Sequence, residues 1–197
     1  MEYAIVFLPL IGAFISGFFG KTLGDKYSQI LTSLLVSISG ILSLIIFYEV
    51  ISENYSSNKL IFNWISSGDF HVNWSINIDP LTSVMLVVVS LISSLIHFYS
   101  IGYMSHDPHT PRFMSYLSLF TFAMLTLVTA DNFLQLFFGW EGVGLCSYLL
   151  IGFWYKKPSA NSAAIKAFIV NRVGDFGFAL GIFLIFYLFG TVNYDEV

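Results

Sequence analysis

The strongest constraint on the fold is a series of long apolar runs that follow one another along almost the whole chain. A helix that crosses a lipid bilayer needs about 20 mostly apolar residues. Several runs approach or exceed that length, at about 3–19, 28–51, 80–104, 113–130, 132–155 and 160–190. The sequence therefore predicts an all-α polytopic membrane protein with about six transmembrane helices.

The composition agrees with a membrane protein and excludes several other classes. Charged residues make up 10% of the chain and hydrophobic residues 56%, whereas soluble domains carry about 25% charged residues. The net charge of −4 is spread over short loops, so we expect no nucleic-acid partner. The first apolar run lacks a basic segment before it and a cleavage pattern after it, so we interpret it as a retained span.

Lysine and arginine are distributed unequally between the loops. The loops after the first, third and fifth runs carry Lys21, Lys26, Arg112, Lys156 and Lys157. The loops on the opposite side carry only Lys59. Because basic residues concentrate in cytoplasmic loops, this asymmetry predicts an N-terminus on the outer side of the membrane.

One connection has the pattern of a β-hairpin rather than of a simple loop. In residues 70–79 apolar and polar side chains alternate, which is typical of a strand with one buried face. The preceding residues 58–65 and the turn-like residues 66–69 complete a hairpin, 58–79, on the outer side, between the second and third spans. We expect it to rest on the helices or on a neighbouring protein, with an ordered loop as the alternative.

Four ionisable residues lie inside the predicted spans, where each costs about 2.5–3.5 kcal/mol to insert. Counted along the helix from Asn132, Glu141 lies roughly 14 Å deep. Counted from Ala160, Arg172 lies roughly 18 Å deep and Asp175 roughly 22 Å deep. Lys166 lies at a shallower depth of roughly 9 Å. Residues of this kind usually mark an ion or proton path and face protein or water.

The three deep residues allow different interpretations. Arg172 and Asp175 are spaced i, i+3, so they form either a purely structural ion pair or part of a functional site. Glu141 has no cation within two turns of its own helix, and Gly139, Gly142 and Gly144 leave room for another helix or for water. We interpret Glu141 as a proton-binding carboxylate, with a protonated hydrogen-bonding group between helices as the alternative.

The remaining candidates are weaker. His97 lies near a span end among aromatic residues, where a packed, hydrogen-bonded histidine is favoured over a proton relay. His106, Asp107 and His109 faintly resemble a metal site, but the neighbouring prolines favour a rigid turn. A single cysteine, Cys146, cannot hold an iron–sulfur cluster. We therefore expect no metal, no cofactor and no redox centre in this chain, and a role in moving protons.

Three stretches closely resemble the L-subunit family of respiratory complex I, known as subunit 5 in mitochondria. They are IDPLTSVMLVVVSLISSLIHFYSIGYM (78–104), FFGWEGVGLCSYLLIGFWY (137–155) and KAFIVNRVGDFGFALGIF (166–183). The segment around WEGVGLCSY and the NRVGD sequence are specific to this family. The broader family includes the large subunit of multi-subunit cation/proton antiporters, in which the surroundings of the glutamate differ.

The resemblance implies a subunit of NADH:quinone oxidoreductase that moves protons across a bacterial or mitochondrial inner membrane. It also implies partner membrane subunits, with NADH, FMN, iron–sulfur clusters and quinone held elsewhere in the complex. Glu141 matches the family's proton-channel glutamate, and Arg172 and Asp175 match the pair beside it. The chain would then comprise spans one to three with the hairpin (1–111) and the start of the antiporter-like bundle (112–197), as an N-terminal part that lacks the family's partner lysine.

Two alternatives stay open at this point. The first is the large subunit of a Na⁺/H⁺ antiporter, which would make Na⁺ transport dependent on this protein. The second is a structural membrane spacer, in which replacing Glu141 by Gln and Asp175 by Asn would both be silent.

Overall fold

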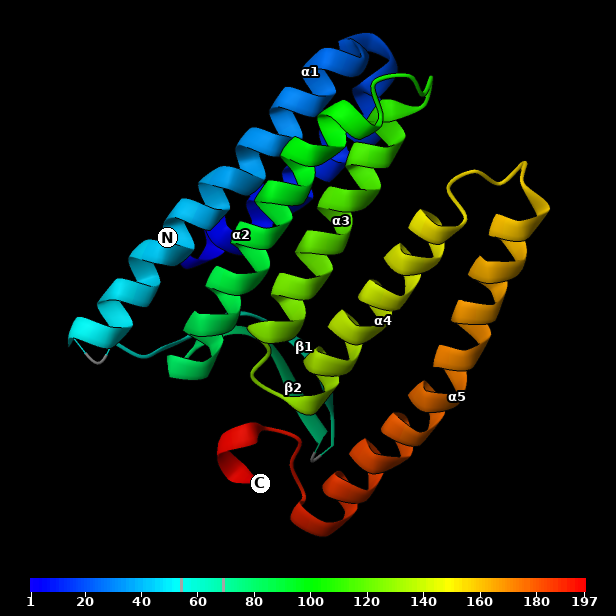
Figure 1. Cartoon of the computed structure of the whole chain (residues 1–197). Helices are drawn as coiled ribbons and strands as arrows, with labels where there is room; N and C mark the ends of the chain where they lie inside the picture. Colours follow the sequence, from blue (N-terminus) through cyan, green and yellow to red (C-terminus); the bar gives the residue numbers. More distant parts are fainter. Residues whose placement is uncertain (54, 69) are drawn as a thin grey trace.

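The chain is mostly helical, with one small sheet (Figure 1). The computed structural model describes residues 1–53, 55–68 and 70–197. Over these residues the order of elements is α1 (Glu2–Glu53), β1 (Ser57–Ser67), β2 (Phe70–Ile78), α2 (Pro80–Tyr103), α3 (Thr110–Val128), α4 (Phe133–Ile151), α5 (Pro158–Phe189) and a 3-10 turn (Tyr194–Glu196). All five α-helices are long and apolar enough to cross a membrane.

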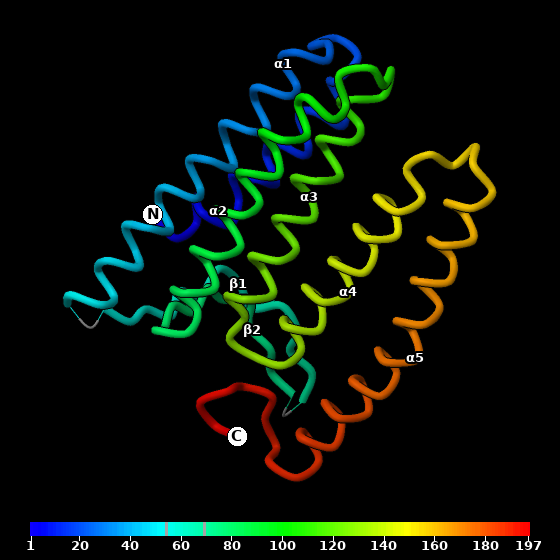
Figure 2. The backbone as a smooth tube through the Cα atoms, viewed as in Figure 1, coloured from blue at the N-terminus to red at the C-terminus, as the bar shows by residue number. Residues whose placement is uncertain are grey.

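The first two predicted spans form one helical element that doubles back on itself. Helix α1 runs through the expected loop between residues 19 and 28 and departs from helical geometry at Gly24, where φ is 78°. This left-handed conformation is accessible to glycine at little cost. Figure 2 shows the two halves of α1 side by side, and Ser39 Oγ donates to the carbonyl of Ile5 at 2.7 Å between them.

The other helices lie close to their predicted positions, with shifted ends. The predicted run 132–155 is too long, because α4 stops at Ile151 and residues 152–157 form the turn into α5. Pro158 starts α5 at a position where its missing N–H costs nothing. Gly190, with φ of 73°, ends α5 in the left-handed conformation common at helix C-termini.

Helices α1, α2 and α3 form a closely packed group that is held together by hydroxyl groups. Ser43 and Ser90 join α1 to α2 at 2.6 Å between their Oγ atoms, and Ser115 donates from α3 to the carbonyl of Ala13 at 2.7 Å. Lipid tails are as apolar as leucine, so such hydrogen bonds and close approaches of small residues hold membrane helices together.

Helices α4 and α5 extend from this group in sequence order. Helix α4 contacts α3, and α5 contacts α4 but has no comparable contact with α1, α2 or α3 (Figure 1). The buried residues of α5 are Ala164, Asp175 and Ile182. The buried side of α5 is therefore mostly apolar, and it includes one carboxylate, Asp175, which contacts Trp140 of α4.

The two-stranded antiparallel hairpin expected from the alternating pattern is confirmed. Val72, Ile76 and Ile78 are buried as predicted, but Ser75, on the supposed wet face, is buried too. The side-chain amide of Gln135 on α4 explains this, since it accepts from the Ser75 N–H at 3.0 Å and donates to the Ser75 carbonyl at 2.7 Å. The expected turn residue Asp69 lies outside the described residues.

The hairpin rests on the helices of the same chain, which was one of the supports expected for it. Val72 packs with Ile182 of α5 and Val192 of the C-terminal segment. The amide of Asn132, at the start of α4, donates to the Asn73 carbonyl at 2.8 Å. The hairpin thus ties together the ends of α4 and α5.

The basic loops after the first, third and fifth predicted spans lie at the end of the molecule opposite the hairpin (Figure 1). Lys59 of the hairpin forms an ion pair with Glu2 at 3.0 Å, which fixes the start of α1 at the hairpin end. At the other end Arg112 Nη2 donates to the Phe153 carbonyl at 3.2 Å, which joins the start of α3 to the α4–α5 connection. Successive connections therefore lie at opposite ends of the helices, as the distribution of basic residues predicted.

Candidate functional site

The ionisable residues of α4 and α5 form one charge cluster. Arg172 Nη1 forms an ion pair with Glu141 across the two helices. The same nitrogen lies 3.6 Å from a carboxylate oxygen of Asp175, one turn further along α5. The side chain of Asp175 is 10% exposed and that of Glu141 is 22% exposed. One guanidinium is therefore shared between two carboxylates of different burial.

This geometry corrects one interpretation of the sequence. Glu141 was expected to be an unpaired carboxylate, because its own helix carries no nearby cation. The cation comes from the neighbouring helix instead, and it is Arg172, which sequence spacing assigned to Asp175 alone. The expected proximity of Arg172 and Asp175 at i, i+3 is present, but it is the longer of the two contacts.

Two aromatic side chains that the sequence did not single out complete the cluster. Trp140 donates its indole N–H to Asp175 Oδ1 at 2.8 Å. The guanidinium carbon of Arg172 lies 4.6 Å from the ring centroid of Phe168, one turn earlier on α5. An indole N–H generally needs an acceptor, and an arginine four residues after an aromatic residue lies above its ring on a helix. These two signals were present in the sequence.

The glycines beside Glu141 have different surroundings. A Cβ on Gly139 would lie 2.7 Å from the backbone of Leu127 on α3, so this glycine allows the close approach of α3 and α4. A Cβ on Gly142 would lie 3.1 Å from Ala123. Among the described residues nothing lies within 4 Å of a Cβ on Gly144. Only the first two glycines therefore support helix packing here.

The other candidate residues lie away from this cluster. His97 on α2 is completely buried, with Nδ1 2.8 Å from the Ser93 carbonyl and Nε2 3.0 Å from Ser118 Oγ on α3. This is the packed, hydrogen-bonded arrangement that was favoured. Lys166 is exposed on α5, and it makes no ion pair within the described part of the chain.

The loop residues 106–109 form a hydrogen-bonded turn. Asp107 accepts from the Trp154 indole N–H and from the His109 backbone N–H, each at 2.8 Å. Partial burial works to raise the pKa of Asp107, but these hydrogen bonds outweigh it and the pKa is lowered. Both carboxylate oxygens are used by protein donors. No group of three or more metal-ligating side chains comes together in the described ranges.

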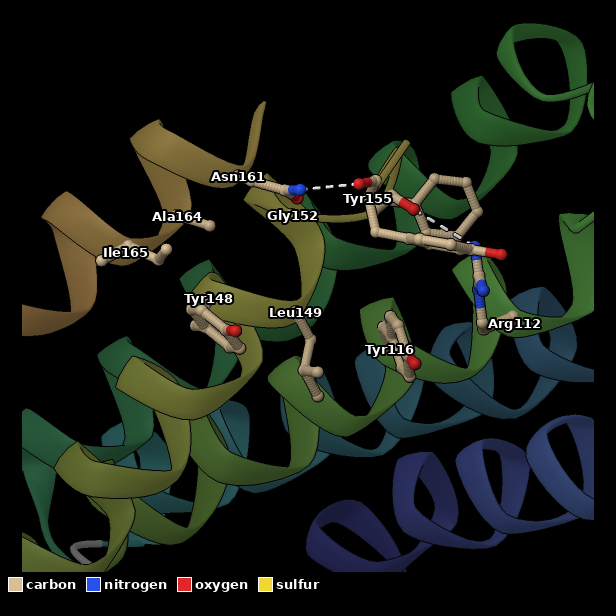
Figure 3. Close-up of a pocket in the computed structure, with 10 residues that line it drawn as sticks. Arg112, Tyr116, Tyr148, Leu149, Gly152, Tyr155, Asn161, Ala164 and Ile165 are labelled. Atoms are coloured by element: carbon tan, nitrogen blue, oxygen red, sulfur yellow. Dashed lines mark hydrogen bonds between the residues drawn. The ribbon is translucent and has the colours of Figure 1, made fainter. Parts of the chain in front are cut away.

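Two cavities border α4 and α5, and the larger one is also lined by α3. One, of about 410 Å³, opens at the end with the basic loops and is lined by Arg112, Tyr116, Tyr148, Tyr155 and Asn161, among others (Figure 3). The other, of about 180 Å³, touches the charge cluster and is lined by Trp140, Ser147, Asn171 and Asp175, among others. The arrangement holds one cation, Arg172, between two carboxylates, and the smaller cavity reaches one of them, Asp175.

The fold and the charge cluster define the class of this chain as a polytopic helical membrane protein with paired charges between two membrane-length helices. Two family models match the chain. The model described as NADH-ubiquinone oxidoreductase (complex I), chain 5 N-terminus, matches residues 64–114, and the model described as NADH:quinone oxidoreductase/Mrp antiporter, TM, matches residues 130–197. The chain belongs to this antiporter-like family of membrane subunits, and the second match contains the whole charge cluster.

Relatives from plants, algae and bacteria are named as subunits of NADH oxidoreductases. NADH-ubiquinone oxidoreductase chain 5 of Triticum aestivum is 59% identical over all 197 residues, and that of Chondrus crispus is 55% identical over the same length. NADH-quinone oxidoreductase subunit L of Rickettsia bellii is 53% identical over 193 residues, or 98% of this chain. The chain spans 29–30% of the length of these relatives.

Solved structures share the fold at lower identity. The archaeal membrane-bound sulfane sulfur reductase, a respiratory membrane complex, contains a chain that matches with a TM-score of 0.83 and 18% identity. The Mrp complex from a Dietzia species matches with a TM-score of 0.83 and 23% identity. These matches cover 98% and 99% of this chain, and 38% and 20% of the respective chains. They establish the antiporter-like fold.

Proposed function

We propose that this chain is part of a proton-translocating membrane subunit of NADH:quinone oxidoreductase. The observation that carries the proposal is the sharing of Arg172 between Glu141 and Asp175 inside two membrane-length helices. Intramembrane ionisable residues usually mark ion or proton paths. The 53–59% identity to complex I subunits, against 23% to an Mrp chain, favours complex I over the antiporter alternative.

The membrane arrangement follows from the same proposal. Each half of α1 crosses the membrane once, so the chain crosses six times and the N-terminus and hairpin lie on the outer side. This is supported by the gathering of the basic loops at the end opposite to Lys59. Residues 1–111 hold the first three spans and the hairpin. Residues 112–197, whose first helix α3 also packs against α1, begin the proton-channel bundle in a bacterial or mitochondrial inner membrane.

The proposed cycle alternates the partner of Arg172. While Arg172 pairs with Glu141, that carboxylate stays ionised. When the guanidinium moves toward Asp175, Glu141 loses its cation in a poorly hydrated site and takes a proton from water. The return of Arg172 displaces this proton, which passes to water in the cavity beside Asp175. The chain itself supplies no redox chemistry, and NADH, FMN, iron–sulfur clusters and quinone belong to partner subunits.

The test is Glu141→Gln in the complete subunit within the assembled complex, with NADH oxidation and proton uptake measured side by side in membrane vesicles. The expected result is a fall of both activities, while the amount of assembled complex is unchanged. Glu53→Gln, at an exposed acidic residue at the end of α1, is the matched control. Unchanged activities in Glu141→Gln would favour the spacer alternative, and Na⁺ uptake that depends on Glu141 would favour the antiporter.

A further inference from the structure

The two cavities between α4 and α5 lie in the same seam but are separated from each other. The cavity at the loop end reaches Tyr148 on α4 and Ile165 on α5. The cavity beside the charge cluster begins at Ser147 on α4 and Asn171 on α5. Along α5, residue 168 therefore falls between the linings of the two cavities.

An aromatic contact fills this position. The rings of Tyr148 and Phe168 have centroids 5.4 Å apart across the seam, and both side chains are half-buried. Figure 3 places Tyr148 at the inner side of the loop-end cavity, with Arg112, Tyr155 and Asn161 nearer its other side. Apolar ring faces exclude water, so a continuous water path along this seam is interrupted at Tyr148 and Phe168.

The same ring also contacts the charge cluster. The guanidinium of Arg172 lies over the face of Phe168, with 4.6 Å between its central carbon and the ring centroid, while Arg172 pairs with Glu141. A cation placed over an aromatic face is attracted to it, more strongly when water is excluded. Movement of Arg172 away from Glu141 would remove this contact, and would free the Phe168 ring to move.

Glu141 lies on the same side of α4 as the contact between Tyr148 and Phe168. Tyr148 follows it by seven residues, so the two side chains lie on the same side of α4, roughly 10 Å apart along the helix axis. Water that passes Tyr148 and Phe168 would enter the cavity lined by Ser147 and Asn171, which borders Asp175. From there Arg172 bridges Asp175 to Glu141.

We propose that Phe168, in contact with Tyr148, is a positioning residue that closes the seam between a water-filled vestibule and the charge cluster while it holds Arg172 on Glu141. The inference rests on the proposed function and adds the entry route of the proton. The proton passes from water in the loop-end cavity to the Glu141 carboxylate when Arg172 moves to Asp175. With Arg172 back on Glu141, the ring closes the way back.

The test uses Phe168→Ala in the complete subunit within the assembled complex. The expected result is a loss of protons moved per NADH oxidised, with continued NADH oxidation and a higher passive proton permeability of the vesicles without NADH. Phe168→Tyr retains the ring and is expected to retain coupling. Phe183→Ala, at an exposed ring further along α5, is the matched control. A ring that only packs two helices would change the amount of assembled complex and leave this ratio unchanged.

The proposal is overturned if assembled Phe168→Ala complex keeps both the proton ratio and the passive permeability of the unaltered complex. It is also overturned if Phe168→Tyr leaks as much as Phe168→Ala. Should Phe168→Ala fail to assemble, Tyr148→Ala opens the same contact from α4 and must give the same leak. Because Glu141→Gln alone tests the proposed function, a wrong barrier and a wrong function give different results.

Discussion

Trp140 and Asp175 are joined across α4 and α5 by a hydrogen bond of 2.8 Å from the indole N–H to a carboxylate oxygen. The bond holds the Asp175 carboxylate beside the Arg172 guanidinium, which Asp175 shares with Glu141. The residue directly before the central glutamate of α4 thus positions the second carboxylate on α5. It links the two helices through their most deeply buried charge.

Replacing Trp140 by Phe keeps an aromatic ring and removes only this donor. We expect the free energy of unfolding to fall by about 1.5 kcal/mol. This is the low end for a hydrogen bond to a charged group, because Trp140 is half exposed. Proton transport per NADH oxidised should fall, as measured in membrane vesicles. Trp154→Phe removes the same kind of N–H at Asp107 and serves as the control. Equal proton transport per NADH oxidised in both variants would contradict a positioning role of Trp140.

Gly139 should tolerate no side chain, whereas Gly144 should. A Cβ at Gly139 would lie 2.7 Å from the backbone of Leu127, so Gly139→Ala forces α3 and α4 apart. Overpacking of this kind costs about 1–3 kcal/mol. Gly144→Ala meets no atom within 4 Å of the described chain and should leave stability nearly unchanged. Thermal unfolding of the solubilised complex measures the difference, and equal melting temperatures would refute it.

The turn that contains Asp107 should lose stability in acid. The pKa of Asp107 is lowered in the folded protein because the hydrogen bonds from Trp154 and His109 outweigh the effect of burial. A lowered pKa means that the contribution is present above the unfolded value, about 4, and is lost as the pH falls through the folded value. Hydrogen exchange of residues 104–110 should show this loss of protection below about pH 4.

Asp107→Asn is the matched variant for this measurement. It removes the titration while it retains an oxygen acceptor for the indole of Trp154. Its loop should exchange faster than that of the unaltered protein at neutral pH, and the difference should disappear in acid. A difference that persists below the unfolded pKa would show that the charge of Asp107 is not responsible.

Local patterns in the sequence were sufficient for most of the fold. Apolar runs of membrane-spanning length predicted helices where α2 to α5 lie, because the length and composition of a span are set by the bilayer and not by its neighbours. The alternation in residues 70–79 predicted β2, because a strand with one buried face repeats every two residues. The i, i+3 spacing of Arg172 and Asp175 placed them within reach of each other, because both residues lie on one helix.

Contacts between different helices were decided only by the tertiary structure. The partner of Glu141, the indole donor to Asp175 and the ring contact between Tyr148 and Phe168 all depend on how α4 lies against α5. The burial of Ser75 likewise depends on Gln135, which is distant in the sequence. In a bilayer all apolar helix faces resemble one another to the surrounding lipid, so the apolar pattern cannot specify which faces meet. Small residues and hydrogen bonds between helices make that choice, and they take effect only once the helices are packed.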